Sequence, residues 1–366
     1  MSEYILVLIW LGIAAAISSA IGQQSVVNIC GKYEKRYSLI WAVVVMLPII
    51  WWAGNRDAVA ADTSAYIRQF NTMPNTFAEL GGYVETLSKD KGFYFLSALI
   101  RIFITKDSTV YFLILAAIQG GVLVWVYRKY SINYVVSIFL FVASTDYISW
   151  MYNGIRQFTA VTITFLGIGL ILKKRYITAV ILIVLASQFH QSALLVLPFI
   201  FICQGEVWNK KTVFFLVIIL AAVVGAGSFT GLLDQVLADT QYQNVVTDWT
   251  TANDDGTNMM RVLVYSIPAI LSFWKRDIIQ EENNPVINLC TNMSIVSSGL
   301  YLLSAFTSGI FMGRLPIYFS LYNYILLPWE VEHLFAEEES KIVKGCMIAG
   351  YLLFYYYSMH VTWNNF

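Results

Sequence analysis

Apolar runs of membrane-spanning length recur along almost the whole chain, with mostly short polar segments between them. Hydrophobic residues make up 58% of the sequence and charged residues only 13%, with a mean hydropathy of +0.63. A water-soluble domain of this composition would expose large apolar patches and aggregate. In a bilayer, each crossing takes about 20 mostly apolar residues in a helix, which satisfies all of its backbone hydrogen bonds. The sequence therefore predicts an all-α, polytopic integral membrane protein.

We expect about 12 membrane-spanning helices, which together form one transmembrane domain over residues 1–366. The predicted spans are Tyr4–Gly22, Leu39–Ala53, Thr109–Tyr127, Ile132–Ile148, Ile155–Leu172, Tyr176–Phe189, Ser192–Ile202, Thr212–Ser228, Met260–Trp274, Val286–Phe306, Arg314–Trp329 and Ile342–Ser358. A further apolar run, Phe93–Ile104, is too short to span and carries Arg101 in its middle. It is expected to form a re-entrant or interfacial helix.

Lysine and arginine cluster in alternate segments between the predicted spans. These basic residues are Lys32, Lys35, Arg36, Arg128, Lys129, Lys173, Lys174, Arg175, Lys210, Lys211, Lys275, Arg276, Lys341 and Lys344. All of them share one side if Phe93–Ile104 does not cross, and the positive-inside rule makes that side cytoplasmic. Both chain termini are then expected outside, together with two longer outer loops at about residues 54–92 and 231–259.

Charge balance and motif content exclude several classes of protein. The 23 basic and 23 acidic residues cancel, so nothing suggests a nucleic-acid partner. The four cysteines form no Cys-x-x-Cys pair, and all map to the predicted cytoplasmic half, which argues against disulfides and a thiolate metal site. The sequence has no Walker loop, no dinucleotide-binding glycine motif, and no zinc-protease or serine-hydrolase signature. We expect no cofactor.

Six arginines lie on the predicted outer side, where the positive-inside rule makes arginine rare: Arg56, Arg68, Arg101, Arg156, Arg261 and Arg314. A guanidinium group binds phosphate through two parallel hydrogen bonds and stays charged. Arg156 and Arg314 lie close to predicted helix starts, which also attract anions. They are the first candidates for binding a diphosphate, with Arg261 and Arg56 as weaker ones. The alternative for each is a contact with a lipid headgroup or a loop aspartate.

His190 lies where one predicted helix ends on the outer side and the next returns. Its imidazole titrates near neutral pH, so it can accept a proton from a hydroxyl group or steady a phosphate. The alternative is a core histidine bonded to a backbone carbonyl. Asp62, in the first outer loop, is the second candidate base. Asp57 and Asp62 are five residues apart and share no helical face, so we predict no metal site.

Several segments occur in the order found in a known family. The residues Arg56-Asp57 and Asp62–Tyr66 look like its Asp-x-x-x-Tyr loop, and Lys91–Leu96 resembles its Gly-Phe-aromatic segment. Asn153–Gln157 is similar to its Asn-x-x-Arg-Gln stretch. Phe189–Leu194 resembles its His-x-Ser-Ala-Leu turn, and Gly313–Phe319 its late Arg-x-x-x-Tyr-Phe element. The family is the EpsG-like group of Wzy polysaccharide polymerases. One departure is Asp90-Lys91, where the family usually has an acidic residue followed by proline.

The resemblance implies a glycosyltransferase with a fold like that of the C-type glycosyltransferases. It would transfer a growing glycan from polyprenyl diphosphate to the sugar end of a lipid-linked repeat unit. The product would be O-antigen, capsule or exopolysaccharide. Tyr66, Gln157 and Asn153 would contact this substrate.

The implied location is the bacterial plasma (inner) membrane, with an active site facing the periplasm or exterior. Expected partners are the polyprenyl-diphosphate-linked oligosaccharide, membrane lipids, a chain-length regulator and a flippase. Two alternatives stay open. One is a transporter or flippase of lipid-linked oligosaccharide, and the other is a membrane acyltransferase that modifies the glycan with His190 as base.

Overall fold

The computed structural model describes residues 2–21, 24–58, 62–225, 229, 231–233, 235 and 254–362. Most of the predicted outer loop 231–259 therefore lies outside the described residues. The chain forms two compact units, unit 1 (Met1–Leu195 with Glu337–Phe366) and unit 2 (Val196–Ala336).

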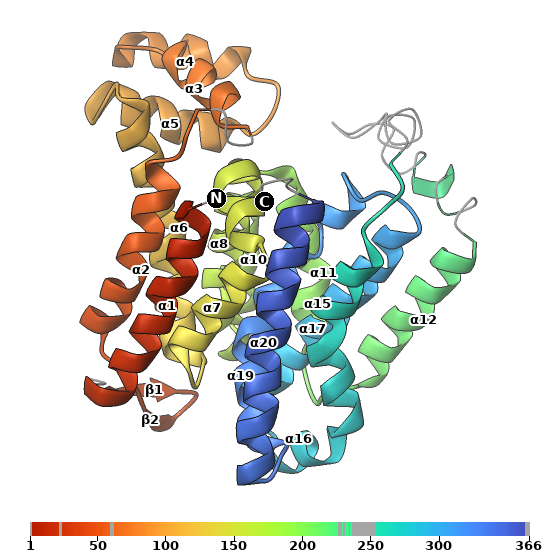
Figure 1. Ribbon diagram of the computed structural model, residues 1–366. Helices are drawn as coiled ribbons and strands as arrows, with labels where there is room; N and C mark the ends of the chain where they lie inside the picture. Colours follow the sequence, from red (N-terminus) through yellow and green to blue (C-terminus); the bar gives the residue numbers. More distant parts are fainter. Residues whose placement is uncertain are drawn as a thin grey trace. The chain divides into compact units, whose positions relative to one another are not determined.

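Helices dominate both units (Figure 1). In unit 1 they are α1 (Ser2–Ile21), α2 (Leu39–Gly54), α3 (Thr63–Asn71), α4 (Phe77–Thr86), α5 (Lys91–Phe103), α6 (Ser108–Tyr130), α7 (Tyr134–Ala143), η1 (Tyr147–Asn153), α8 (Ile155–Leu166), α9 (Ile168–Leu172), α10 (Tyr176–Ser187), η2 (Gln191–Leu195) and α20 (Glu337–Val361). In unit 2 they are α11 (Val196–Ile202), α12 (Lys210–Val224), α15 (Met259–Trp274), α16 (Arg276–Glu282), α17 (Pro285–Ala305), η3 (Met312–Arg314), α18 (Ile317–Ser320) and α19 (Asn323–His333).

The long helices begin at polar N-cap residues, which stand directly before the apolar runs. Asp107 accepts hydrogen bonds from the amides of Thr109 and Val110 at the start of α6. Asn284 caps α17 in the same way, and Pro285 takes the first helical position, where no amide donor is needed. These caps satisfy donors that an apolar environment would otherwise leave unpaired.

Three helical stretches among the described residues are long and apolar enough to cross a bilayer: Ser108–Tyr130, Ile155–Leu172 and Pro285–Ala305. The pair α7 and η1 would make a fourth, although it bends by 74°. The chain is thus a nearly all-α protein with membrane-type helices, while the count of about 12 crossings and the C-type glycosyltransferase-like fold stay predictions.

The predicted span Ile132–Ile148 does not form one continuous helix in the structure. Its helix stops at Ala143, Thr145 takes a positive φ of 68°, and the chain continues as the π-helix η1. A residue with positive φ cannot continue a right-handed helix, so the axis turns there.

A β-hairpin follows α1, in a segment where the sequence predicted no regular structure. Strands β1 (Gln24–Ile29) and β2 (Lys32–Tyr37) pair antiparallel around Cys30 and Gly31, which both have positive φ. A two-residue turn of this kind matches the twist of the strands that it joins. Arg128 at the end of α6 donates to the Tyr37 carbonyl at 2.8 Å and to Ser25 Oγ at 2.7 Å, which fixes the hairpin to the helix end.

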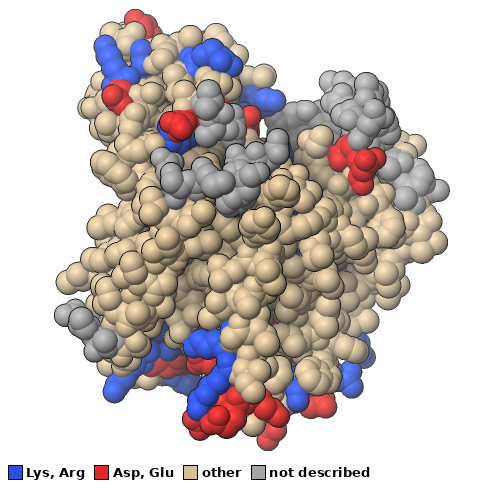
Figure 2. Space-filling model, in the orientation of Figure 1, with Lys and Arg blue, Asp and Glu red and all other residues tan. Residues whose placement is uncertain are grey.

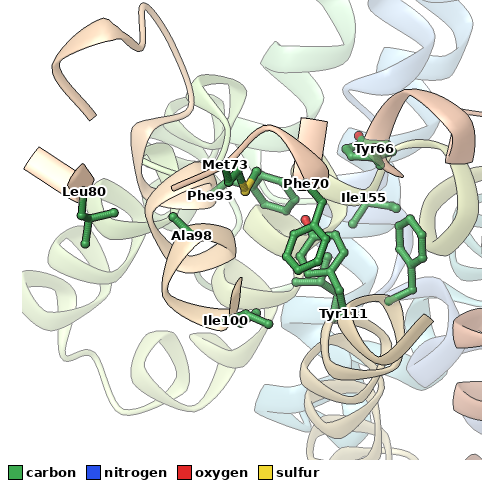
Figure 3. Packing of buried hydrophobic residues seen from close by; sticks show 11 residues of the cluster. Tyr66, Phe70, Met73, Leu80, Phe93, Ala98, Ile100, Tyr111 and Ile155 are labelled. Atoms are coloured by element: carbon green, nitrogen blue, oxygen red, sulfur yellow. The ribbon is translucent and has the colours of Figure 1, made fainter. Parts of the chain in front are cut away.

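The short helices α3, α4 and α5 pack together beyond the ends of α2 and α6 (Figure 1). Their buried apolar side chains, among them Phe70 and Phe93, form one cluster with Tyr111 of α6 (Figure 3). The predicted run Phe93–Ile104 is α5. Arg101, on this helix, donates to the Met73 carbonyl at 3.1 Å, and its guanidinium lies over the Phe70 ring. Both contacts join α5 to the segment that contains Phe70 and Met73.

Charged side chains gather at the two ends of unit 1. Figure 2 shows Lys and Arg over α3–α5 at one end and around the hairpin and the start of α20 at the other. The face between these ends carries neither basic nor acidic side chains in this view. Such a band matches what a hydrocarbon core requires.

Candidate active site

Arg156 is the centre of a polar cluster in unit 1. Its Nη1 donates to Asp90 Oδ2 at 2.7 Å and to the Tyr94 hydroxyl at 3.2 Å. The Tyr94 ring also lies 5.7 Å from the guanidinium carbon. The side chain of Asp90 is 4% exposed and that of Arg156 is 26% exposed, so the ion pair lies just beneath the surface.

The local fold explains why Arg156 stands there. The π-helix η1 ends at Asn153, and Gly154 packs so tightly on Trp150 that a Cβ would lie 2.6 Å from its ring. Helix α8 then starts at Ile155, which belongs to the same apolar cluster as Tyr66 and Phe93 (Figure 3). Arg156 is therefore the second residue of a spanning-length helix, where helix amides also favour an anion.

Tyr66 completes the first layer around this arginine. The tyrosine is 7% exposed, and its hydroxyl hydrogen-bonds to both the backbone and the side chain of Arg156. Burial raises the pKa of Tyr66, although Arg156 opposes this shift. The hydroxyl therefore stays protonated at neutral pH. The sequence motif that begins at Asp62 thus delivers a tyrosine, and not its aspartate, to the arginine.

Asp90 combines three unfavourable features. It has a left-handed backbone conformation, with φ 54° and ψ 36°, which is uncommon for a residue with a Cβ. Its Oδ1 is buried without a hydrogen-bond partner. Burial raises the pKa of its carboxyl group, against the pull of Arg156 and Lys89. Costs of this kind concentrate at functional sites.

His190 lies in the turn between α10 and η2, in the same unit. Its Nδ1 is 2.6 Å from Ser192 Oγ, and the ring is partly buried. The turn is joined to the start of α5 because the Gly92 amide donates to the Gln188 carbonyl at 2.8 Å. Two segments that the sequence singled out separately, around Gly92 and His190, are therefore adjacent.

Arg56 has a different environment from that expected of a diphosphate ligand. Its Nε donates to the Ala53 carbonyl at 2.6 Å and its Nη1 to the Tyr152 carbonyl at 3.2 Å. The guanidinium lies between the rings of Phe112 and Tyr152, 4.6 Å from each centroid. Burial lowers the pKa of Arg56 to about 10, so it stays charged at neutral pH. These contacts favour a role in joining the ends of α2 and α6.

The other candidates in unit 1 are dispersed. Asp62 is exposed at the N-cap of α3, where its backbone carbonyl accepts from the Tyr66 amide at 3.2 Å. Asp57 is also exposed. Asn153 is half-buried at the end of η1, and Gln157 is 4% exposed in α8, one residue after Arg156.

Arg261 and Arg314 belong to unit 2. Arg261 lies in the first turn of α15, with its guanidinium 5.9 Å from the Tyr265 ring centroid. Arg314 is exposed at the end of the 3₁₀ turn η3.

The turn before Arg314 is organised by Asp254, which the sequence did not single out. Its carboxylate accepts from Ser308 Oγ at 2.6 Å and from the amides of Ile310, Gly309 and Gly256 at 2.9, 3.0 and 3.1 Å. Burial alone would raise the pKa of this carboxyl group, but the four hydrogen bonds lower it. The Asp254-Asp255-Gly256 sequence, which is typical of a turn, is the signal that could have indicated this contact.

Asp90 and Tyr94 are the other residues that sequence reasoning missed as members of the site. The signal for Asp90 was the acidic position before the Gly-Phe-aromatic segment, where this chain departs from the family only at Lys91, and Tyr94 lies within that segment. No group of three or more His, Cys, Asp or Glu side chains that would suit a metal ion occurs among the described residues.

The fold and the cluster together define a helical protein with membrane-type helices and an arginine-centred polar cluster at the start of a spanning-length helix. The sequence model of the EpsG family matches residues 39–365, which is most of the chain. The chain therefore belongs to the EpsG family, a family of Wzy-like polysaccharide polymerases of the glycosyltransferase type. No match was found among curated proteins or among solved structures.

Proposed function

We propose that this polymerase transfers a growing glycan from polyprenyl diphosphate to the sugar end of a lipid-linked repeat unit. The observation that carries this proposal is the environment of Arg156, which is charged, only partly covered and set at a helix start. The guanidinium group of Arg156 supplies paired N–H donors for a diphosphate, and the start of helix α8 adds a favourable helix dipole. Membership of the EpsG family makes a lipid-linked oligosaccharide the natural ligand.

In this reaction the bond between the anomeric carbon and the diphosphate oxygen breaks while the acceptor hydroxyl attacks that carbon. Negative charge grows on the leaving diphosphate, and a fixed cation lowers the energy of that transition state. Arg156 is the main ligand of the diphosphate. Arg314 and Arg261, which belong to unit 2, stay candidates from the sequence alone, and Arg56 is the weakest candidate because its donors bind backbone carbonyls.

His190 and Asp62 are the two groups that the sequence assigns to acid–base chemistry. His190 either accepts the proton of the acceptor hydroxyl or orients the donor phosphate. Its Nδ1 lies 2.6 Å from Ser192 Oγ, and this contact orients the ring. Asp62 is the alternative base. Tyr66, Gln157 and Asn153 lie on the elements around Arg156 and contact the sugar units.

The lipid part of the substrate needs an apolar surface near this site. A pocket of about 250 Å³ lies between α2 and α6, lined by apolar side chains such as Ile50 and Trp125 and opened by Ala117 and Gly121. Helix α6 also carries Phe112, which belongs to the apolar cluster beneath the site. One helix therefore connects the polar cluster with a surface that suits an isoprenoid chain.

The protein acts in the bacterial plasma (inner) membrane, with Arg156 facing the periplasm or exterior. This orientation follows from the alternation of basic segments. A flippase that delivers repeat units and a chain-length regulator are the expected partners, and the product is O-antigen, capsule or exopolysaccharide.

The test is an assay with purified protein, polyprenyl-diphosphate-linked repeat units and detergent or vesicles. We expect the lipid-linked glycans to lengthen by whole repeat units. Movement of the lipid across a vesicle membrane without lengthening would indicate a flippase, and a mass increase by one acyl group would indicate an acyltransferase. Either result without lengthening would overturn the proposal.

A further inference from the structure

The ion pair between Asp90 and Arg156 leaves one carboxylate oxygen unused. Asp90 Oδ2 accepts from Arg156 at 2.7 Å, whereas Oδ1 is buried and has no hydrogen-bond partner. Leaving a buried acceptor without a hydrogen-bond partner is destabilising. A structural carboxylate would be expected to use both oxygens, so the free oxygen points to a ligand or to chemistry.

The backbone at Asp90 adds a second cost. Its φ of 54° is uncommon for a residue with a Cβ, although aspartate and asparagine adopt it more often than other such residues. The start of α5 is also held in place from outside, because the Gly92 amide binds the Gln188 carbonyl. The surrounding structure thus helps to hold this carboxylate in its position beside Arg156.

We propose that Asp90 is a catalytic residue of the transfer reaction, accepting the proton of the acceptor hydroxyl once the donor diphosphate has drawn Arg156 away from it. This inference rests on the proposed function. Asp90 pairs with Arg156 and stands between Lys89 and Lys91 in the chain. Withdrawal of Arg156 removes the nearer positive charge, so the carboxylate becomes a stronger base at the moment when the donor is in place.

The proton and electron balance of this step is complete. The acceptor O–H bond breaks and its proton moves to Asp90, while the acceptor oxygen forms the new glycosidic bond to the anomeric carbon. The bond from that carbon to the diphosphate breaks, and the electron pair leaves with the polyprenyl diphosphate, which Arg156 holds. Asp90 then releases its proton to water. His190 keeps the second of its two proposed roles, that of orienting the donor phosphate.

The variants Asp90→Asn and Asp90→Gly test this assignment, because both residues suit the positive φ. Glu85→Gln, an exposed carboxylate on α4, is the matched control. We measure chain lengthening, thermal unfolding and the binding of farnesyl diphosphate as a diphosphate probe. Asp90→Asn should bind the probe at least as tightly as the wild type and lose about 10²–10⁴-fold in turnover. Glu85→Gln should behave as the wild type.

Added formate gives a second readout, because it can supply a carboxylate to the space that Asp90→Gly leaves. We expect formate to restore part of the turnover of Asp90→Gly and none of that of His190→Gln. Tighter probe binding by Asp90→Asn with normal turnover would mean that Asp90 only occupies the anion site. A lower unfolding temperature for both variants, without rescue by formate, would mean a structural role. Either result overturns the proposal.

The same assay separates Asp90 from the other candidate bases and from failure of the proposed function. If Asp62→Asn or His190→Gln abolishes turnover while Asp90→Asn retains it, that residue is the base and Asp90 is not. If the wild-type protein does not lengthen lipid-linked glycans at all, the proposed function falls, and the inference with it.

Discussion

The amide of Gly92 and the carbonyl of Gln188 form a 2.8 Å hydrogen bond, and the two residues are so close that a Cβ on Gly92 would lie 2.8 Å from Gln188 Cβ. Only a residue without a side chain allows this approach without a shift of the backbone. The contact joins the start of α5, with Asp90, to the turn that carries His190.

Gly92→Ala should therefore separate these two segments. We expect a loss of about 1–3 kcal/mol in unfolding free energy from the forced contact, together with reduced polymer formation. Gly82→Ala is the control, because a Cβ at that exposed position of α4 meets nothing within 4 Å. It should leave stability unchanged or raise it by about 0.5–1 kcal/mol. Thermal unfolding in detergent measures both, and equal behaviour of the two variants would contradict the role of the contact.

Substitutions of Arg156 should weaken donor binding according to the geometry of the new side chain. Arg156→Ala should cost about 2–5 kcal/mol in binding a prenyl diphosphate, since it leaves a buried anion site without its cation. Arg156→Lys should recover little of this, because lysine keeps the charge and loses the planar fork. Calorimetry with farnesyl diphosphate provides the measurement, and the exposed Arg68→Ala is the control. Normal binding by Arg156→Ala would remove this residue from the site.

The hydrogen bonds of Asp254 should make the stability of the fold decrease as the pH falls. Its hydrogen bonds place its folded-state pKa below the unfolded value, so the carboxylate stabilises the fold above about pH 4, and this contribution is lost as pH falls through the folded value. Asp254→Asn should lower the unfolding free energy at pH 7 by about 1–3 kcal/mol, the scale of hydrogen bonds to a charged group.

Unfolding curves measured from pH 7 downward should show this difference shrinking as the wild-type carboxylate becomes protonated. Asp255→Asn, the exposed neighbour, should follow the wild type at every pH. A gap between Asp254→Asn and wild type that persists at the lowest pH would show that the carboxylate charge is not the cause.

We expect the reaction to need no divalent cation, because the arginines balance the charge of the leaving diphosphate. Treatment with a chelator should leave the rate of chain lengthening unchanged. If a chelator abolishes the activity and Mg²⁺ or Mn²⁺ restores it, Asp57 and Asp62 become the first candidates for metal ligands.

A native cysteine tests the orientation in the membrane. Cys30 is free and exposed, and it lies in a segment predicted to be cytoplasmic. In intact cells, an impermeant maleimide should not label Cys30, although it should do so after permeabilisation. A cysteine introduced in place of Glu85 should react in intact cells. Labelling of Cys30 before permeabilisation would reverse the predicted topology.

Much of the helical framework could be predicted because apolar runs and caps are local signals. The predicted span Leu39–Ala53 differs from α2 by only one residue. The agreement is close because local groups mark both ends: Ser38 caps the first turn, and Arg56 donates to the Ala53 carbonyl at the last turn. The break after Ala143 could not be read in the same way. Residues on both sides of it are apolar, and only the backbone conformation of Thr145 reveals the turn.

The site was only partly predictable for a related reason. Arg156 and His190 can be recognised in the sequence because they are polar residues in apolar surroundings. The partner of Arg156 cannot be recognised in this way, because Asp90 is 66 residues away in the sequence. Loop carboxylates at Asp57, Asp62 and Asp90 look equivalent in sequence, and only tertiary packing selects the one that meets the arginine.

Helix α20 belongs to unit 1, although all of unit 2 is synthesised before it. It packs on α7, and its Tyr355 hydroxyl donates to the Tyr4 carbonyl of α1 at 3.3 Å. During translation, the faces of α1 and α7 that α20 covers therefore stay without this partner until unit 2 has been synthesised. The unit that holds Arg156 can be completed only after the chain of unit 2 has been made.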